Sequence, residues 1–314
     1  MAGPPRVDVG MVTWNTRDLS LAALAKLTQS DQNVDIRVLL RDNGSTDGTA
    51  EAVRAEFPDV VVDSDGDNLG FGAGMNRLLA RSTAPWFFAL NGDAWPEPGA
   101  IGTLVTAATK HPRVGAVAPR LERPDGSLEH STHRFPSVRL AARSARPGWV
   151  QRHPERAHAE LLHEAWRHDE TRLVDWAVGA ALLMRRTTVD EAGGFDERLF
   201  MYAEDLEWCW RAHDAGWSVL FCHDAVVRHV GNVSGAQSYG GARSAAYWRN
   251  TYRVYRDKRG VAAAAAYRGT NLLGTTAAYF RYIRNPGLRR YWRQELRGHL
   301  SSTRGPDGPP QRAG

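Results

Sequence analysis

The 314-residue sequence is poor in cysteine and contains no long apolar run. Its two cysteines, Cys209 and Cys222, exclude a disulfide framework and argue against a cysteine-based zinc site. No stretch approaches the roughly 20 apolar residues that span a bilayer, and the N-terminus lacks the basic start and apolar core of a secretory signal. These absences predict a cytoplasmic protein.

The charge is unevenly distributed along an otherwise ordinary globular composition of 42% hydrophobic and 24% charged residues. Residues 241–304 carry 14 lysines and arginines against two acids, whereas the whole chain has a net charge of only +5. Since residues 305–314 are neutral, residues 1–240 carry a net charge of −7. The chain therefore combines an acidic body with a basic C-terminal segment.

The first hundred residues alternate between apolar runs and helical patterns. This alternation predicts an α/β fold with a mostly parallel sheet. The predicted strands are 7–14, 36–40, 60–62 and 86–90. Ligands of such sheets lie beyond the carboxyl ends of the strands, where Asn15, Asp42 and Asp93 are expected to converge.

The second half is less regular. We expect a long crossover over 120–172 that borders a substrate site, and strands and turns over 173–184. A helix follows at 205–215, then two short strands at 217–221 and 226–229, and helices from residue 245 onward. The predicted divisions are a catalytic domain (1–240), a basic, aromatic-rich helical extension (241–300) and a disordered tail (301–314).

Two polar turns after predicted strands suggest a nucleotide site. Asp42 begins the turn DNGSTD, which either caps a helix or presents a carboxylate to the N3–H of a pyrimidine, with Trp14 and Asn15 flanking the same base. Asn91 and Asp93 follow a buried strand in the turn NGD. This turn is either merely polar or places Asp93 where a hard cation could bridge it to a diphosphate.

A glycine-rich string, NLGFGAGMN, runs from Asn68 through Gly70 to Asn76. It follows the third predicted strand and does not match the G-x-G-x-x-G pattern of a first βα turn, which disfavours a dinucleotide site. Its glycines would allow the backbone to approach a ribose or diphosphate closely.

Glu204 and Asp205 stand at the start of a predicted helix. The helix N-terminus favours an ionised carboxylate, as a general base requires, although both acids could simply complement the helix dipole. His229 ends a predicted strand and, paired with Asp93, would complete a sparse cation site open to phosphate oxygens.

Together and in order, these segments resemble the inverting family 2 glycosyltransferases with the GT-A fold, most closely their rhamnosyltransferase-like branch. The resemblance covers about residues 7–257. The segments that carry it are DNGSTDGT (42–49), NLGFGAGMN (68–76), LNGDAWPEPG (90–99), VDWAVGAALLMRR (174–186), GGFDERLFMYAEDLEWCWRAHDAGW (193–217) and HVGNVSG (229–235).

The resemblance implies a role for each candidate residue. Asp205 would be the catalytic base, and Asp93 with His229 would hold Mg²⁺ or Mn²⁺. Asn91 replaces the first aspartate of the family's D-x-D motif. The expected donor residues are Trp14, Asn15, Asp42, Asn68, Gly70, Asn76, Asn91 and Asp93. The expected acceptor residues are Glu204, Asp175, Trp176 and Gly179.

The expected reaction moves a sugar from a nucleotide-diphosphate donor, dTDP-rhamnose or a UDP-sugar, to a saccharide or polyprenyl-linked acceptor in bacterial cell-surface glycan synthesis. A nucleotidyltransferase is a weaker alternative, because residues 13–17 lack the glycines of a phosphate loop. The second alternative is a catalytically silent carbohydrate-binding or assembly protein of the same fold.

The basic segment alternates arginines with tyrosines and tryptophans, a composition that suits an anionic membrane surface. It favours peripheral association with the inner face of the cell membrane beside a lipid-linked acceptor. The alternative is a set of packed helices with a solvated basic face. Nucleic acid is not an expected partner, since no nucleic-acid motif accompanies the charge.

Overall fold

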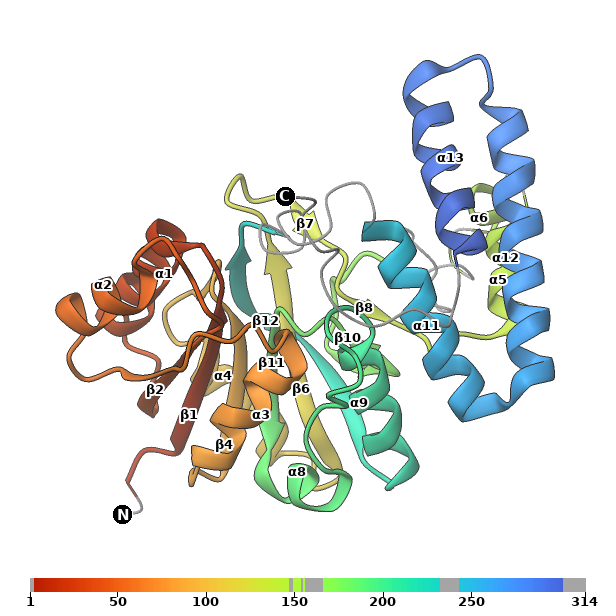
Figure 1. The fold of residues 1–314 in the computed structure, drawn as a ribbon. Coiled ribbons are helices and arrows are strands. Elements are labelled where there is room, and N and C mark those ends of the chain that lie inside the picture. Colours follow the sequence, from red (N-terminus) through yellow and green to blue (C-terminus); the bar gives the residue numbers. More distant parts are fainter. Residues whose placement is uncertain (1–2, 147–148, 154, 156–165, 232–242, 302–314) are drawn as a thin grey trace.

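The structure is a computed structural model that describes residues 3–146, 149–153, 155, 166–231 and 243–301. Except for residue 301, the predicted tail at 301–314 lies outside these residues. A mixed ten-stranded sheet forms the middle layer (Figure 1), in the order β3-β2-β1-β4-β11-β6-β12-β5, with β7 beside β6 and β9 beside β12. The strands are β1 (Arg6–Thr13), β2 (Asp35–Asp42), β3 (Val61–Ser64), β4 (Trp86–Asn91), β5 (Ala94–Pro96), β6 (Val114–Glu122), β7 (Leu128–Glu129), β9 (Arg172–Val174), β11 (Ala181–Arg185) and β12 (Ser218–His229).

The first four strands are parallel, which brings their carboxyl ends together. In the register of this part of the sheet, Thr13 at the end of β1 pairs with Asp42 at the end of β2. On the other side of β1, Val12 pairs with Asn91 at the end of β4. The predicted α/β class is confirmed, as is the convergence of polar residues at one edge of the sheet.

Helices cover both faces of the sheet and form two apolar clusters. Successive side chains of β4 point to opposite faces of the sheet and therefore enter different clusters. Phe87 packs in one cluster and Phe88 in the other, and both are fully buried. The Phe88 cluster includes residues of α1 (Arg17–Gln29), α2 (Thr49–Glu56) and α4 (Ala100–Thr109). The Phe87 cluster includes residues of α3 (Phe71–Arg81), α8 (Arg186–Ala192) and α9 (Glu204–Asp214).

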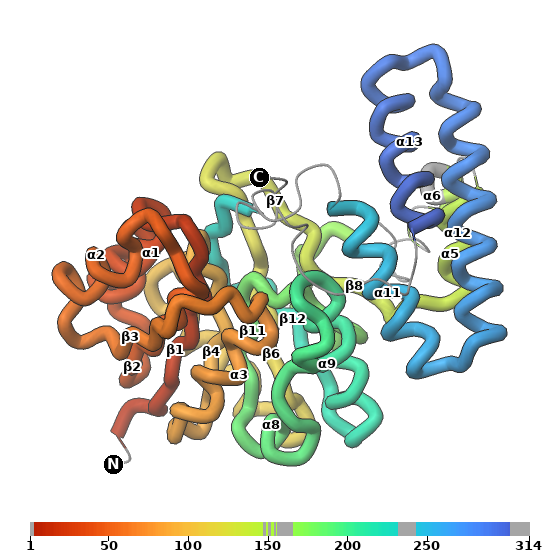
Figure 2. Tube along the Cα trace, viewed as in Figure 1, coloured from red at the N-terminus to blue at the C-terminus, as the bar shows by residue number. Residues whose placement is uncertain are grey.

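Three helices follow the sheet: α11 (Arg243–Arg259), α12 (Val261–Arg281) and α13 (Pro286–Leu300). The tube in Figure 2 shows α12 and α13 as a hairpin that stands away from the sheet, while α11 lies between the hairpin and the body. Tyr252 and Tyr255 of α11 pack in the Phe87 cluster. His299 of α13 bonds the hydroxyls of Tyr252 and of Thr275 in α12, so it joins the three helices.

Two sequence-based expectations differ from the structure. The predicted strands 217–221 and 226–229 are one strand, β12, whose register is irregular between Cys222 and Val226. Because β6 pairs with β12 on both sides of this irregularity, β12 continues as one strand past the polar residues between Cys222 and Val226. The expected crossover at 120–172 also contains regular elements. These are the end of β6, β7, β8 (Thr132–His133), which pairs with β10 (Trp176–Ala177), α5 (Val138–Ser144) and α6 (Trp149–Arg152).

Candidate active site

Asp42 ends β2 and is buried at the edge where the parallel strands meet. Its Oδ2 accepts hydrogen bonds from the Ser45 amide and the Ser64 hydroxyl, both at 3.2 Å. Its Oδ1 is buried and has no hydrogen-bond partner. Buried polar atoms are nearly always bonded, so an acceptor left open at this place fits an N–H group of a ligand such as a pyrimidine base.

Trp14 and Asn15 follow β1 at the same edge, as expected. Asn15 has a positive φ of 50°. Its amide donates to the Ser45 hydroxyl at 2.9 Å, and its Oδ1 accepts from the Thr46 amide at 2.8 Å. Asn15 thus fixes the turn that follows Asp42, and its contact with a base stays a prediction.

Arg41 is a feature of this edge that sequence reasoning missed. Its side chain is fully buried and pairs with Asp63 and Asp65 while donating to Asn43 Oδ1. Asn43 in turn donates from Nδ2 to the main-chain oxygen of Gly70 at 2.8 Å. An arginine directly after the apolar run 36–40 was the signal that could have revealed this network, which ties the Asp42 turn to the glycine-rich string.

The glycine-rich string opens α3 and links the two halves of the site. Gly70 has a φ of +80°, and a Cβ at this position would lie 2.2 Å from the main-chain oxygen of Phe200. The next amide, that of Phe71, donates to this oxygen at 3.0 Å. Asn68 Oδ1 accepts from the Gly70 amide at 3.1 Å. The string therefore docks closely against the loop that precedes Glu204.

Asn76 lies further along α3. Its Nδ2 donates to the Phe195 oxygen and to Glu197 Oε1, both at 2.9 Å, and its Oδ1 accepts from the Phe195 amide at 2.8 Å. These bonds hold the 195–197 loop against α3. The predicted contact of Asn76 with a nucleotide sugar is not tested by this geometry and stays a prediction.

The expected cation ligands, Asp93 and His229, lie side by side. Asp93 Oδ1 is 3.4 Å from His229 Nε2, and Asn91 Nδ2 is 3.3 Å from the same nitrogen. Glu129 Oε2 lies 2.9 Å from the other ring nitrogen, Nδ1. Sequence reasoning did not find Glu129, because it lies 100 residues from His229 in a segment without a motif.

This arrangement fits a divalent cation. Asp93 Oδ2 is buried without a partner. Burial alone would lower the pKa of His229, but its bonds to Asp93 and Glu129 raise that pKa to about 9. The two carboxylates thus concentrate negative charge here, and a carboxylate on the far nitrogen is the usual support of a metal-bound histidine. The described residues hold no cluster of three or more His, Cys, Asp or Glu ligands, so phosphate oxygens or water would complete the shell.

Glu204 and Asp205 occupy the first turn of α9, as predicted. Asp205 Oδ2 accepts a hydrogen bond from the Gly179 amide at 2.9 Å. Burial raises the pKa of Asp205, and burial together with the charge of Asp205 raises that of Glu204 well above its usual value. Glu204 Oε2 is buried without a partner. The pair offers one ionisable base and one open polar atom, which suits proton transfer from a hydroxyl.

The turn before this pair is strained. Tyr202 and Ala203 have φ angles of 71° and 70°, a left-handed conformation that costs roughly 1–3 kcal/mol for each non-glycine residue. Asn250 of α11 holds the turn by donating from Nδ2 to the main-chain oxygens of Met201, at 3.0 Å, and Tyr202, at 3.2 Å. Its position could not be found from the sequence, since no motif contains it.

The other expected acceptor residues surround β10. Asp175 accepts from the Phe135 amide at 2.8 Å and pairs with Arg134. Trp176 donates from its ring to the Arg134 oxygen at 3.0 Å. Both residues hold the 132–135 segment in place, and their contact with an acceptor stays a prediction.

Residues 179 and 180 connect the turn of Asn91 and Asp93 to the first turn of α9. The main-chain oxygen of Ala180 accepts from the Asn91 amide at 2.9 Å, while the preceding residue, Gly179, contacts Asp205. A Cβ on Gly179 would lie 3.3 Å from the Phe71 ring and 3.5 Å from the Cβ of Asp205, so the 179–180 turn packs directly against α3 and α9. The structure therefore joins the NGD turn, the 179–180 turn and the start of α9 into one site.

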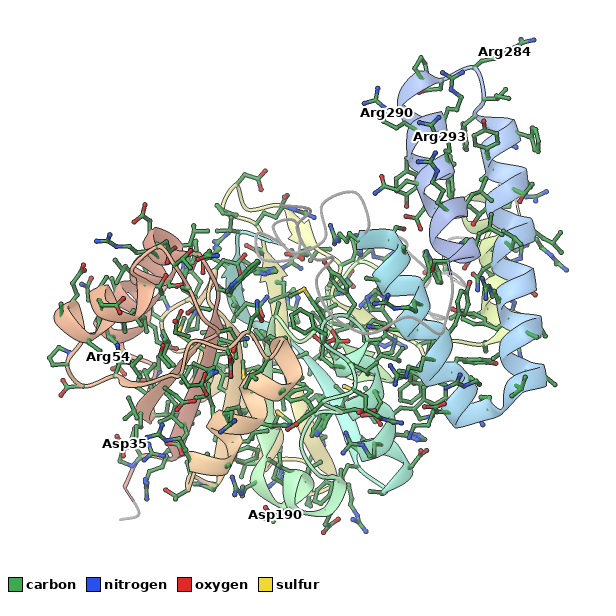
Figure 3. The ribbon with its side chains drawn as sticks, in the orientation of Figure 1. Asp35, Arg54, Asp190, Arg284, Arg290 and Arg293 are labelled. Carbon is green, nitrogen blue, oxygen red and sulfur yellow. The ribbon has the colours of Figure 1, made fainter. Side chains whose placement is uncertain are left out.

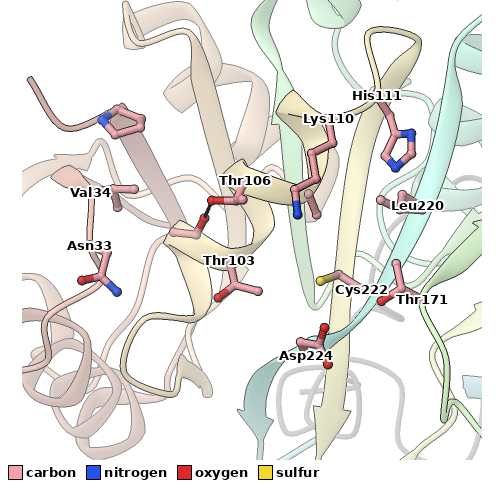
Figure 4. A pocket seen from close by; sticks show the side chains of 13 residues that line it. Asn33, Val34, Thr103, Thr106, Lys110, His111, Thr171, Leu220, Cys222 and Asp224 are labelled. Atoms are coloured by element: carbon pink, nitrogen blue, oxygen red, sulfur yellow. Dashed lines mark hydrogen bonds between the residues drawn. The ribbon is translucent and has the colours of Figure 1, made fainter. Parts of the chain in front are cut away.

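A separate hollow of about 550 Å³ lies beside α4 and β12 (Figure 4). Its lining includes Lys110, Cys222 and Asp224 and none of the predicted site residues. It lacks a convergent set of buried polar groups, and we assign it no role in the chemistry.

Comparison with known proteins agrees with this geometry. Residues 8–168 match the model of glycosyl transferase family 2, and residues 169–284 match that of glycosyl transferase family 21. The chain is 32% identical over 291 residues to an N-acetylglucosaminyl-diphospho-decaprenol L-rhamnosyltransferase of Mycobacterium tuberculosis, covering 88% of this chain and 91% of the relative. It is 26% identical to the O-antigen biosynthesis protein RfbC of Myxococcus xanthus, over 81% of this chain and 19% of that protein.

Solved structures show the same fold. A mannosyltransferase from Pyrobaculum calidifontis, in complex with GDP-Man and Mn²⁺, superposes with a TM-score of 0.61 at 18% identity, over 95% of this chain and 86% of the other. GalNAc-T7 with UDP, GalNAc and Mn²⁺ gives a TM-score of 0.55 at 13% identity, over 74% and 44% of the two chains. The predicted GT-A fold is confirmed. Because the family 2 model matches half of the chain and the M. tuberculosis relative is 32% identical over most of both chains, the chain belongs to glycosyl transferase family 2.

Proposed function

We propose that this glycosyltransferase moves a sugar from a nucleoside diphosphate to a hydroxyl of a lipid-linked saccharide, with inversion at the anomeric carbon. One observation supports the site assignment most directly. Asp42, Asp93 and Glu204 each keep one buried side-chain oxygen without a partner. They stand where a base, a cation and an acceptor are expected, and a bound donor, cation and acceptor would satisfy the three oxygens.

The protein's own groups divide the reaction between them. Asp205, with Oδ2 held by Gly179, takes the proton of the acceptor hydroxyl as that oxygen attacks the anomeric carbon. Glu204 orients the acceptor through its open oxygen. Asp93 and His229 would hold Mg²⁺ or Mn²⁺, which would supply positive charge beside the departing diphosphate. Asp42 receives the base N–H.

The relatives guide the choice of substrates. The M. tuberculosis relative is named for an L-rhamnosyl transfer to N-acetylglucosaminyl-diphospho-decaprenol, and the P. calidifontis structure holds GDP-Man with Mn²⁺. We propose dTDP-rhamnose as the donor and a polyprenyl-diphosphate-linked saccharide as the acceptor, in cell-surface glycan synthesis. UDP-sugars are the alternative donors.

Such an acceptor places the reaction at a membrane. No helix among the residues that the structure describes is both long and apolar enough to cross one. We propose that the enzyme works at the cytoplasmic leaflet as a peripheral protein, with its basic C-terminal segment toward anionic lipid.

The test is a transfer assay with a short-chain diphosphate-linked N-acetylglucosamine acceptor, Mn²⁺ or Mg²⁺, and a panel of dTDP-, UDP- and GDP-sugars, with the product detected by mass spectrometry. We expect the acceptor to gain one deoxyhexose from dTDP-rhamnose. Transfer from a UDP-hexose alone would replace the proposed donor. No transfer from any donor, with nucleotide binding intact, would contradict the proposed acceptor.

A further inference from the structure

The far end of the α12–α13 hairpin exposes a cluster of large apolar side chains. We call residues 280–293 the hairpin end. Its most exposed apolar side chains are Phe280, at 63%, and Tyr291, at 53%, and they are accompanied by Ile283 and Leu288, each 40% exposed. Apolar side chains gathered at one protruding turn are typical of a surface that meets a partner or a membrane.

The same end is strongly and uniformly basic. The exposed arginines of the hairpin end are Arg281, Arg284, Arg289, Arg290 and Arg293. No aspartate or glutamate occurs between residues 258 and 294. The next acid, Glu295, is turned inward, where it accepts from the hydroxyl of Ser244 and from the ring nitrogen of Trp248. The hairpin end thus has no acidic side chain of its own to balance its charge.

The hairpin end also has a definite orientation. In Figure 1 the hairpin rises in the direction in which the parallel strands end, so its turn points the same way as the active-site edge of the sheet. Figure 3 shows Arg284 at the uppermost point of the molecule, with Arg290 and Arg293 lower on α13, on the side toward the body. A flat surface that touches this end would face the carboxyl edge of the sheet.

We propose that the hairpin end docks on an anionic lipid bilayer, with Phe280, Ile283, Leu288 and Tyr291 in the interfacial layer and the arginines on the headgroups. This inference rests on the proposed function only in that a lipid-linked acceptor gives the docking its purpose. Apolar side chains surrounded by arginine bind such a surface through buried area and charge together. A second copy of the chain would bring two sets of unbalanced arginines together, which disfavours self-association through this end.

Docking would also orient the enzyme. Because the hairpin end and the site open in the same direction, the bilayer would lie over the strand ends rather than behind the helices. A diphosphate-linked saccharide at the headgroup level would then lie on the same side of the enzyme as the carboxyl edge of the sheet.

Vesicle flotation of the full chain tests the proposal. We expect the protein to float with vesicles of phosphatidylglycerol and phosphatidylcholine and to stay behind with phosphatidylcholine alone. The double variant Arg284→Glu/Arg290→Glu should bind the anionic vesicles at least about 30-fold more weakly, given the usual contribution of each arginine near such a surface. Phe280→Ser/Ile283→Ser should also weaken binding, and the loss should persist at low salt.

The matched control is Arg54→Glu/Lys110→Glu, which makes the same change in net charge at exposed residues of the body. It should float like the parent. Equal loss in this control would show a net-charge effect and overturn the assignment to the hairpin end. A concentration-dependent dimer in sedimentation, abolished by the hairpin variants and without flotation, would assign the end to a second copy instead.

Nucleotide calorimetry and transfer to a water-soluble acceptor separate this inference from the proposed function. The hairpin variants should keep both. An enzyme that transfers sugar but does not float contradicts the docking alone, whereas one that floats but transfers nothing contradicts the proposed reaction alone.

Discussion

Asn250 and Tyr202 are 48 residues apart in the sequence and are joined by a hydrogen bond of 3.2 Å from the side-chain amide of Asn250 to the main-chain oxygen of Tyr202. Asn250 is fully buried, and its second bond, to Met201, makes it a clamp on the strained turn that leads into Glu204 and Asp205. A helix outside the sheet therefore fixes the turn that leads into the proposed catalytic pair.

Loss of the clamp should affect turnover more than donor binding. We expect Asn250→Ala to lower kcat about 10- to 100-fold, because a displaced base is poorly aligned, and to leave KM for the donor within about twofold. Unfolding in urea should show a loss of about 1–3 kcal/mol, since two buried carbonyls lose their donor. Asn271→Ala, which removes a bond within α12, is the matched control. An unchanged kcat for Asn250→Ala would show that the 201–202 turn keeps its conformation without the bonds from Asn250.

The base assignment predicts a clean separation of chemistry from binding. Asp205→Asn keeps the size of the side chain but cannot take a proton, so transfer should fall by about 10²–10⁴-fold. Nucleotide affinity, measured by calorimetry, should stay near that of the parent. The control is Asp190→Asn, at an exposed aspartate of α8 paired with Arg186. It should change neither transfer nor nucleotide affinity. Substantial transfer by Asp205→Asn would reassign the base.

Glu129 should matter for the cation even though it faces the far side of His229. Removing its charge by Glu129→Gln weakens the support of the ring, and we expect Mn²⁺-dependent nucleotide binding to fall about 10–100-fold. Asp93→Ala should weaken it further, because a direct ligand is lost. Titration calorimetry and the electron paramagnetic resonance of bound Mn²⁺ give the measurements, with exposed Glu56→Gln as the control. Unaltered Mn²⁺ titration in Asp93→Ala would remove its metal role.

Arg41 should be the costliest charge to remove from the donor edge. Its fully buried guanidinium pairs with the partly exposed Asp63 and Asp65, so Arg41→Met should destabilise the fold by about 1.5–3 kcal/mol, the usual contribution of a hydrogen bond to a charged group. The exposed pair of Arg167 and Asp169 gives the comparison, since Arg167→Met should change stability by about 0–1 kcal/mol. Urea unfolding measures both, and equal losses would contradict the structural role given to Arg41.

His168 should make the fold sensitive to mild acid. Burial lowers its pKa to about 4, and its Nδ1 lies 3.0 Å from the Trp166 oxygen. An unfolded histidine titrates near 6.5, so the unfolded state binds more protons between these two values. The stabilisation is complete above pH 6.5 and declines as the pH falls toward 4.

The measurement is the free energy of unfolding at several pH values in this window. His168→Gln should show a shallower fall with acid than the parent, because glutamine does not protonate. Exposed His111→Gln should keep the parent slope. If the free energy of unfolding of His168→Gln fell with acid as steeply as that of the parent, a group other than His168 would cause the acid sensitivity.

The parts of the site that follow strands were predictable from the sequence. Asp42 and Asp93 come directly after apolar runs, and parallel strands must end at the same edge, so their convergence needed no knowledge of tertiary contacts. The start of α9 was visible for a similar reason, because two acids at a helix N-terminus mark its first turn.

The supporting residues were not predictable in the same way. Glu129 reaches His229 from 100 residues away, and Asn250 reaches the 201–202 turn from a helix with no motif. Asn76 was expected at the donor from its place in the glycine string, and no pattern showed that both ends of its amide also bond the 195–197 loop. Such roles depend on hydrogen bonds between residues far apart in the sequence, and the local sequence pattern does not predict these bonds.

The position of α11 has a practical consequence for protein engineering. This helix touches the 201–202 turn through Asn250 and the hairpin through the Tyr252–His299 bond. A chimaera that exchanges the C-terminal helices between related enzymes should therefore be joined after Arg259, keeping α11 with its own sheet. A graft made before Arg243 would replace Asn250 and with it the two hydrogen bonds that hold the 201–202 turn.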